Sequence, residues 1–345
     1  MAPELATVVQ VHQLGGPELL RLEQVEVPEP EPGEVRFRVA AFALNRADIL
    51  YINGEHYTAL KLPSRVGSEA CGIVDAVGQG VTAWRVGDRV SSVPHFTLHS
   101  DRYGVQGEFA IVREGFLAPW PEGFTAEEAC STWMQYLTAY YALHTVGGLR
   151  SNGAVLLPAG ASSAGGGAIQ VAKAMGARVI STTRAPEKVP YIKSLGADVV
   201  IVTSGERDIA DEIRAATDGK GVNVVFDPIG GAFTRTYFEG LAWEGRVLVY
   251  GLLAGDLEFT VPILPAVRQN ISVHPYSLFN HAMHPDELRD GITWVLAQIR
   301  AGRLRPRIDS IHSFDRTIDA YQRMLTGKQQ GKIVVSVRPV ESLGG

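Results

Sequence analysis

The feature that most constrains the fold is a regular alternation of apolar strands and helices between residues 154 and 251. Residues 154–159 (AVLLPA) predict a buried strand, 168–176 a helix that ends at Gly176, and 178–183 a second strand. Further strands are expected at 198–202, 222–228 and 245–251, with helices at 187–196 and 208–219. Continuous Val, Ile and Leu runs are typical of parallel strands covered on both faces, because parallel neighbours need a crossover. We therefore expect a doubly wound parallel sheet.

The remainder of the chain follows another pattern. Short β-type runs separated by Gly and Pro occupy residues 8–114, and 35–40 (VRFRVA) alternates between apolar and polar positions. Such alternation indicates a mostly antiparallel, half-solvated sheet. After residue 271 the pattern is mixed again, and it ends in a strand at 332–337 (KIVVSV). A chain of 345 residues is long enough for two domains.

Composition excludes several classes of protein. The 32 Lys and Arg against 37 Asp and Glu give a net charge of −5, with both signs scattered. We therefore expect no nucleic-acid and no membrane partner. The two cysteines, Cys71 and Cys130, cannot build a disulfide framework or a four-cysteine zinc lobe. The start MAPELATVVQ lacks the basic region of a signal peptide, so a soluble cytoplasmic protein is expected.

The turn after the first buried strand has the form of a phosphate-binding loop. It reads GASSAG over 160–165, and it connects the strand to a helix. Free N–H groups at a helix N-terminus can face a diphosphate, and small side chains allow its close approach. Serine hydroxyls stand where glycines are common and could donate to phosphate oxygens. An ordinary tight β–α connection is the alternative. The candidate cofactor-binding residues here are Gly160, Ser162, Ser163, Ala164 and Gly165.

The end of the next strand indicates which dinucleotide is bound. An NAD site usually presents an acidic residue there to the ribose hydroxyls, whereas a 2′-phosphate needs cations and hydroxyl donors. This chain has Thr183 and Arg184 at that point, with Lys188 one helical turn further on. A guanidinium can bind a phosphate with two N–H groups, and an ammonium adds a point charge. NADPH is therefore expected rather than NADH, unless both cations are merely solvated surface groups.

Several longer strings occur in an order and spacing that resemble a known family. They are LNRADI (44–49), GSEACGIV (67–74), GEFA (107–110), GASSAGGGAIQVAK, GVNVVFDPIGG (221–231) and QGKIVVSV. With them, the chain resembles the zinc-free quinone oxidoreductase branch of the medium-chain dehydrogenase/reductase superfamily. The resemblance implies a GroES-like catalytic domain (1–127 and 272–345) around a Rossmann NADP-binding domain (128–271). It also implies an active site between these domains and a homodimer.

The same resemblance indicates which metal ligands this chain lacks. Zinc-dependent relatives have Cys, His and Cys ligands, where this chain has Asn45, Ser68 within Gly67-Ser68-Glu69, and Met134. None of these three side chains is a good zinc ligand. We therefore predict no metal in the site.

Without a metal, the acceptor itself must stabilise the charge that hydride transfer creates. Quinones and activated C=C bonds, such as enones and 2-haloacrylates, spread this charge by conjugation, so hydrogen-bond donors can suffice. The spacing places Asn45, Asp48 and Tyr51 on one face of a short helical turn, and Tyr57 follows. Asn45 would donate to a substrate carbonyl or a cofactor ribose, and either tyrosine or water would supply the proton. The alternatives are local capping for Asn45 and Asp48 and packing for the tyrosines.

The family pattern also implies groups around the nicotinamide: Thr138, Gly251, Leu252, Ser277, Leu278 and Phe279. Leu278 and Phe279 could equally be core or dimer contacts. The function expected first is NADPH-dependent, zinc-independent reduction of a small molecule, either a quinone or an activated alkene. A metal-free enzyme resembling an alcohol dehydrogenase, or an NADPH-binding protein without turnover, are the alternatives.

Overall fold

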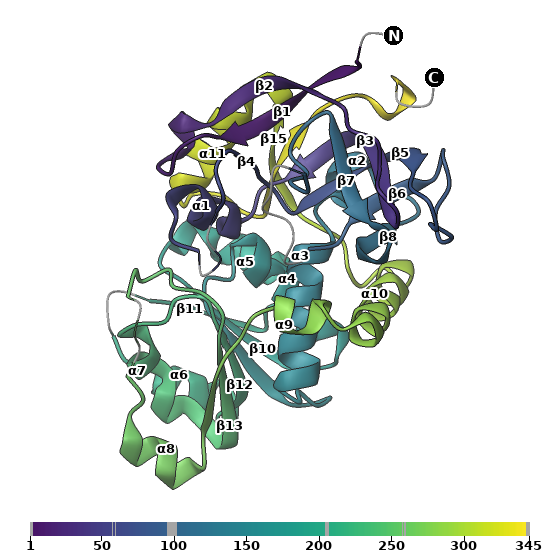
Figure 1. Cartoon of the computed structure of the whole chain (residues 1–345). Coiled ribbons are helices and arrows are strands. Elements are labelled where there is room, and N and C mark those ends of the chain that lie inside the picture. Colours follow the sequence, from purple (N-terminus) through teal and green to yellow (C-terminus); the bar gives the residue numbers. More distant parts are fainter. Residues whose placement is uncertain are drawn as a thin grey trace. The chain divides into compact units, whose positions relative to one another are not determined.

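The computed structural model describes residues 3–56, 58, 60–94, 102–203, 207–256, 258 and 260–342. The chain forms two compact units, each with its own sheet system (Figure 1). Unit 1 comprises Met1–Met134 and Arg305–Gly345, and unit 2 comprises Gln135–Leu304. A β-rich unit made of two chain segments and a continuous parallel-sheet unit confirm the predicted fold class.

Unit 1 contains two sheets. The larger one has the order β15-β16-β3-β5-β6-β8, and β7 also pairs with β3. Its pairs are antiparallel apart from β15 with β16. The smaller sheet has the order β2-β1-β4. The bounds are β1 Leu5–Val11, β2 Arg21–Glu26, β3 Glu34–Ala43, β4 Ser64–Arg65, β5 Glu69–Val77, β6 Arg89–Ser92, β7 Phe109–Arg113, β8 Leu117–Pro119, β15 Ile308–Ser313, β16 Lys332–Ser336, and for the helices α1 Arg46–Asn53, α2 Ala126–Ala129 and α11 Thr317–Leu325.

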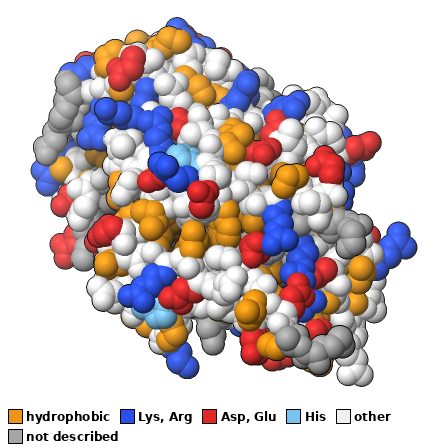
Figure 2. Space-filling view, turned by 90° about the horizontal axis from the view of Figure 1, so that it is seen from above, with side chains coloured by type: hydrophobic (Ala, Val, Ile, Leu, Met, Phe, Trp, Pro, Cys, Tyr) orange, Lys and Arg blue, Asp and Glu red, His pale blue; other side chains and the backbone are white. Residues whose placement is uncertain are grey.

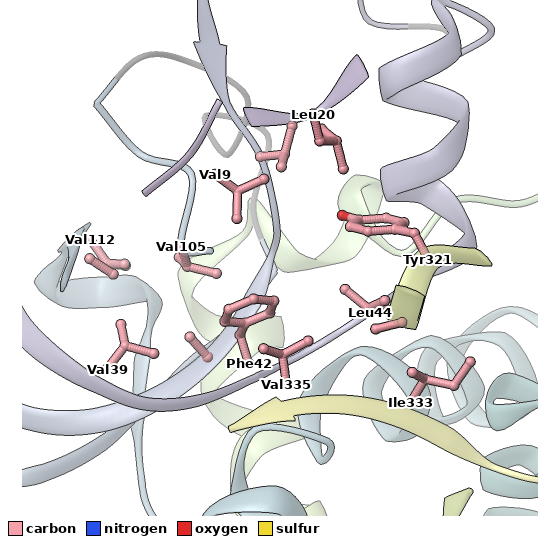
Figure 3. Close-up of a cluster of buried hydrophobic side chains, with 14 of the residues drawn as sticks. Val9, Leu20, Val39, Phe42, Leu44, Val105, Val112, Tyr321, Ile333 and Val335 are labelled. Carbon is pink, nitrogen blue, oxygen red and sulfur yellow. The ribbon is translucent and has the colours of Figure 1, made fainter. Parts of the chain in front are cut away.

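One apolar core joins the two segments of unit 1. Figure 3 shows Phe42 and Leu44 beside Ile333 and Val335, which come from the C-terminal segment. The ring of Tyr321 on α11 belongs to the same cluster. Because both segments bury side chains in one core, the last part of the chain is an integral part of this unit.

Unit 2 is a doubly wound parallel sheet, as predicted. Its strand order is β11-β10-β9-β12-β13-β14, with every pair parallel. The order reverses at β9, which is where such sheets bind their ligands, beyond the carboxyl ends of the strands. The bounds are β9 Ala154–Leu157, β10 Arg178–Thr183, β11 Val199–Val202, β12 Val222–Asp227, β13 Leu241–Val249, β14 Ser272–Pro275, α3 Trp133–Tyr140 (which starts in unit 1), α4 Ser163–Ala174, α5 Val189–Ser194, α6 Ala210–Ala215, α7 Phe233–Tyr237, α8 Ile263–Gln269, α9 Phe279–Ala282 and α10 Pro285–Arg300.

The predicted change of domain at residue 272 is wrong. Strand β14 pairs with β13 in the parallel sheet, with Val273 beside Val247, and α10 follows in the same unit. The chain returns to unit 1 only at Arg305. The sequence of β14, SVHP, is polar and largely exposed, so it lacks the apolar run that marks the other parallel strands. The first boundary lies after Met134 rather than after residue 127.

Both signs of charge occur on the surface, as the composition indicates. On the face shown in Figure 2, basic and acidic side chains are interspersed. Within the described residues, every helix is too short or too polar to span a bilayer.

Candidate active site

The turn between β9 and α4 is the candidate cofactor-binding site of unit 2. Ser162 caps the helix: its Oγ accepts from the N–H of Gly165 at 3.0 Å and donates to the carbonyl of Ala159 at 2.8 Å. Ala159 has a φ of 54°, a left-handed conformation that a non-glycine residue seldom adopts. The hydroxyl hydrogen of Ser162 is thus used within the turn, whereas the sequence had suggested that it would donate to a phosphate.

The same cap leaves two backbone donors available. Within the described residues, the N–H groups of Ser163 and Ala164 have no acceptor, and both residues are half-buried. A Cβ at Gly165 would lie 2.5 Å from the carbonyl oxygen of Ala159, so only glycine fits at this point of the turn. Two free N–H groups at the start of a twelve-residue helix are suited to an anion. The turn therefore fits a dinucleotide diphosphate, through backbone donors more than through serine hydroxyls.

Helix α4 begins earlier than the sequence indicated. It starts at Ser163, whereas the predicted helix began at residue 168. Three glycines at 165–167 disfavour a helix intrinsically. They are retained inside it by close packing, since a Cβ at Gly167 would meet the side chain of Gln135 at 3.0 Å. Tertiary contact thus outweighs helix propensity here.

The end of β10 lies beside this turn. The N–H of Gly160 donates to the carbonyl of Thr182 at 3.1 Å, so the turn and the end of β10 share one edge of the sheet. The hydroxyl of Thr183 is engaged with the backbone of Ala185. Arg184 is exposed, and the described part of the chain offers its side chain no ion pair or hydrogen bond. Lys188 is half-buried in the 3₁₀ turn Pro186–Lys188. A cation next to the turn is what a 2′-phosphate requires.

The other predicted cofactor residues follow further strands of the same sheet. Gly251 and Leu252 come after β13, and Ser277, Leu278 and Phe279 come after β14. Since all these strands are parallel, their carboxyl ends share one edge with the turn after β9. A Cβ at Gly251 would lie 2.6 Å from the carbonyl oxygen of Pro228, so a larger residue is excluded.

These residues differ in exposure. Leu252 is 45% exposed, whereas Leu278 and Phe279 are buried, in agreement with the alternative that they are core residues. Thr138 on α3 is buried as well, and its carbonyl accepts from the hydroxyl of Tyr276 at 2.8 Å. The contact of these residues with a nicotinamide stays a prediction.

The predicted catalytic residues lie around α1 in unit 1. Asn45 is the N-cap residue of this helix, and its backbone N–H donates to Oδ2 of Asp48 at 2.8 Å. Asp48 and Tyr51 are buried, and the ring of Tyr51 stacks on His56 with 4.2 Å between the centroids. Tyr57 lies outside the described residues. The predicted helical turn is present, but Asp48 and Tyr51 are both buried. This agrees with the alternative interpretations, which are local capping for Asp48 and packing for Tyr51.

Asn45 belongs to a buried polar cluster that also includes Ser68, Glu69 and Lys332. Its Nδ2 donates to Oε2 of Glu69 at 3.1 Å and to Oγ of Ser68 at 3.4 Å. Its Oδ1 accepts from the ammonium of Lys332 at 2.7 Å. Both amide hydrogens of Asn45 are thus used inside the protein, so its predicted donation to a substrate would require this cluster to open.

The three positions at which zinc ligands are absent do come together. The N–H of Met134 donates to Oε1 of Glu69 at 2.5 Å, which places it beside Asn45 and Ser68. The ammonium of Lys332 forms an ion pair with Glu69 in the same cluster. The amide of Asn45 and the hydroxyl of Ser68 stand here at ligand positions, the third position contributes the backbone N–H of Met134, and the ammonium of Lys332 lies among them.

The environment of Asp48 alters its acidity. Burial raises the pKa of Asp48 to about 7; the N–H of Asn45 and the charge of Lys332 oppose this rise, and the charge of Glu69 adds to it. Oδ2 also accepts from Gln106 at 3.4 Å, whereas Oδ1 has no partner within the described residues. The hydroxyl of Tyr321 donates to Gln106 at 2.9 Å. Asp48 can therefore be protonated near neutral pH.

Sequence reasoning missed Lys332, Gln106 and Tyr321. Gln106 and Tyr321 carry no local signal, because they reach Asp48 from distant parts of the chain. Lys332 did carry one: it is a charged residue at the start of an otherwise apolar strand. A lysine at the first position of a buried strand needs a partner, and this requirement could have drawn attention to it.

The arrangement defines a class of protein. A β-rich unit formed by both ends of the chain, and a doubly wound sheet with a phosphate-type turn, are the parts of a medium-chain dehydrogenase/reductase, an oxidoreductase. Two family models match: "Alcohol dehydrogenase GroES-like domain" over residues 31–138 and "Zinc-binding dehydrogenase" over 164–296. The chain belongs to the quinone oxidoreductase branch of this superfamily, as its similarity to curated relatives shows.

The chain is similar to two curated proteins and to one solved structure over most of its length. The quinone oxidoreductase of Pseudomonas aeruginosa is 30% identical, over 96% of this chain and 99% of that protein. The synaptic vesicle membrane protein VAT-1 homolog of Rattus norvegicus is also 30% identical, over 98% of this chain and 85% of that protein. A solved mycobacterial structure complexed with NADPH is 28% identical, with a TM-score of 0.86, and covers 96% of this chain and 99% of that chain. The cofactor held by that relative agrees with the predicted one.

Proposed function

We propose that the protein is a zinc-independent, NADPH-dependent reductase of quinones or activated C=C bonds. The observation that carries the proposal is the buried cluster in which Asn45 and Ser68 stand at two of the zinc-ligand positions and the carboxylate of Glu69 is engaged by Asn45, the N–H of Met134 and the ammonium of Lys332. Such a site favours an acceptor whose own conjugation takes up the charge. The names of the Pseudomonas relative and of the NADPH complex support the acceptor class and the cofactor.

The residues of unit 2 would bind the cofactor. The N–H groups of Ser163 and Ala164 would face the diphosphate, and Arg184 would bind the 2′-phosphate with two N–H groups. Lys188 would add positive charge to the same region. When bound, NADPH supplies the hydride.

The residues of unit 1 would act on the acceptor. Hydride addition at the β carbon of an enone leaves negative charge on the carbonyl oxygen, and each well-placed donor there contributes about 3 kcal/mol. Proton delivery to the α carbon is assigned to Tyr51, Tyr57 or water. Since Tyr51 is buried and stacked on His56, Tyr57 or water is the better candidate. A homodimer, as the resemblance implies, remains part of the proposal.

The direct test is product formation from a mixture of acceptors. NADPH and the purified protein are incubated with enones, quinones and haloalkenoates, and the products are identified by mass spectrometry. We expect reduced product at the same rate with or without a chelator. A requirement for added zinc would contradict zinc independence, and tight NADPH binding without any product would favour a non-catalytic role. Alcohol oxidation by metal-free protein would favour the alternative of a metal-free enzyme that resembles an alcohol dehydrogenase.

A further inference from the structure

A buried ion pair occupies the centre of unit 1. Lys332 and Glu69 are the first residues of β16 and β5, and their side chains are 0% and 1% exposed. Both strands pair with β3 close to its end: Ala43 lies opposite Glu69 on one side and Val334 on the other. The two charges therefore meet where the chain leaves β3 and enters Asn45.

Asn45 closes this ion pair into a ring of three side chains. Its Oδ1 accepts from Lys332 at 2.7 Å, its Nδ2 donates to Glu69 at 3.1 Å, and Lys332 contacts Glu69 directly. The remaining oxygen of Glu69 accepts from the N–H of Met134. The amide of Asn45 is fixed by partners at both ends, which leaves it one orientation.

That orientation is transmitted to α1. Asn45 is the N-cap residue of α1, and its N–H is held by Asp48 within the first turn. The N–H of Leu44 also donates to the carbonyl of Ile333 at 3.0 Å, so the backbone before the helix is tied to β16. We propose that Lys332 and Glu69 are positioning residues: their ion pair holds Asn45 inside the cluster and thereby fixes the start of α1, the helix to which the proposed function assigns contact with the acceptor.

The electrostatics distinguish this role from simple packing. Two buried charges are tolerated only together, and removal of one leaves the other without a counterion. A lone carboxylate makes the folded state take up a proton more readily than the unfolded chain, so stability falls as the pH rises. A lone ammonium makes the folded state release a proton more readily, so stability rises with pH. The two single variants should therefore have opposite pH dependences.

Other titratable groups lie near the ion pair, and their contributions to the pH dependence must be separated from that of the pair. Asp48 on α1 interacts with both charges, and Tyr321 on α11 interacts with Asp48. Cys130, which ends α2, interacts with Glu69 and with Cys71 on β5. The contribution of Asp48 does not cancel, because Lys332 lowers its pKa and Glu69 raises it, so either substitution also changes the titration of Asp48. All variants are therefore made in an Asp48→Asn background, which serves as the wild type of the comparison.

The first experiment measures the free energy of unfolding of the full chain between about pH 5 and pH 9. Relative to wild type, Lys332→Met should lose stability as the pH rises, and Glu69→Gln should gain it. The double variant should show neither slope. Equal slopes for the two single variants would overturn the ion-pair role. If Lys332→Met does not fold, Glu69→Gln alone still tests the sign, and Lys332→Arg should keep the wild-type profile.

The second experiment tests the transmission to α1. Amide hydrogen exchange of residues 46–53 should be faster in each single variant than in wild type, and closer to wild type in the double variant. Lys173→Met and Asp198→Asn break an exposed ion pair in unit 2, at 3.0 Å, and provide the matched control. They should leave exchange in α1 unchanged. Unchanged exchange in the Lys332 and Glu69 variants would overturn the proposal.

The kinetic part rests on the proposed function. In folded Glu69→Gln, kcat/KM for the acceptor should fall by about tenfold to a hundredfold, the loss expected from misplaced groups. The Kd for NADPH, measured by fluorescence, should not change. A wild-type kcat/KM despite faster exchange in α1 would refute the role in acceptor contact. If no acceptor is reduced even by wild type, the proposed function fails, whereas the pH slopes and the exchange data still decide the ion-pair role.

Discussion

The turn after β9 and the cluster around Lys332 show two ways of building a functional site. The turn uses neighbouring residues of one chain segment, and it presents the N–H groups of Ser163 and Ala164 while Arg184 stands exposed beside it. The cluster joins Asn45 to Glu69 and Lys332, which lie far apart in the sequence, and it is shielded from water. Substitutions in the turn should therefore affect ligand binding first, whereas substitutions in the cluster should affect folding stability and its pH dependence.

The largest effect is expected at Asp48. Burial raises its pKa to about 7, so the carboxyl group favours folding when protonated, and this contribution is lost as the pH rises from about 4 through 7. A shift of about three pKa units corresponds to roughly 4 kcal/mol. Relative to Asp48→Asn, wild type should therefore lose stability over this range, as measured by urea unfolding at a series of pH values.

Asp198 provides the contrast. Partial burial would raise its pKa, but the N–H of Val179 and the ammonium of Lys173 outweigh it and lower the pKa. Asp198→Asn should therefore cost stability at neutral pH and not in acid, which is the opposite sign. The same pH profile for both variants would mean that the buried cluster does not differ electrostatically from the surface.

A smaller effect is expected at Arg184, in binding rather than stability. Arg184→Ala should raise the KM for NADPH by one to two orders of magnitude and change that for NADH little, since a charge-assisted hydrogen bond contributes roughly 1.5–3 kcal/mol. Arg178→Ala, an exposed arginine at the other end of β10, is the matched control. Equal losses with both cofactors would refute the 2′-phosphate assignment.

The smallest effect is expected at Ser162, and it separates the cap from a phosphate donor. If the hydroxyl caps α4, Ser162→Ala should cost about 1 kcal/mol of stability without cofactor. Ser163→Ala is the control, because Ser163 lies inside the first turn. Loss of NADPH affinity with unchanged stability would instead restore the role suggested by the sequence.

The sequence predicted most of unit 2 because its signals are local. Apolar runs identified β9, β10, β11, β12 and β13, and the small residues of the turn identified the phosphate-type loop. It missed β14, whose polar residues are paired on one edge only, and it placed the start of α4 too late. In both cases neighbouring strands or helices determine the structure, and the residues' own propensities do not.

By itself, the sequence determined the fold class, the strand that leads into the turn, and the cation that follows β10, because hydrophobic periodicity and turn chemistry act over a few residues. Only the tertiary structure decided the surroundings of Asn45. Lys332, 287 positions away, supplies the partner for its amide oxygen. The pairing of β16 with β3 brings this partner to Asn45. A local sequence pattern does not indicate which distant side chain will contact a buried polar group.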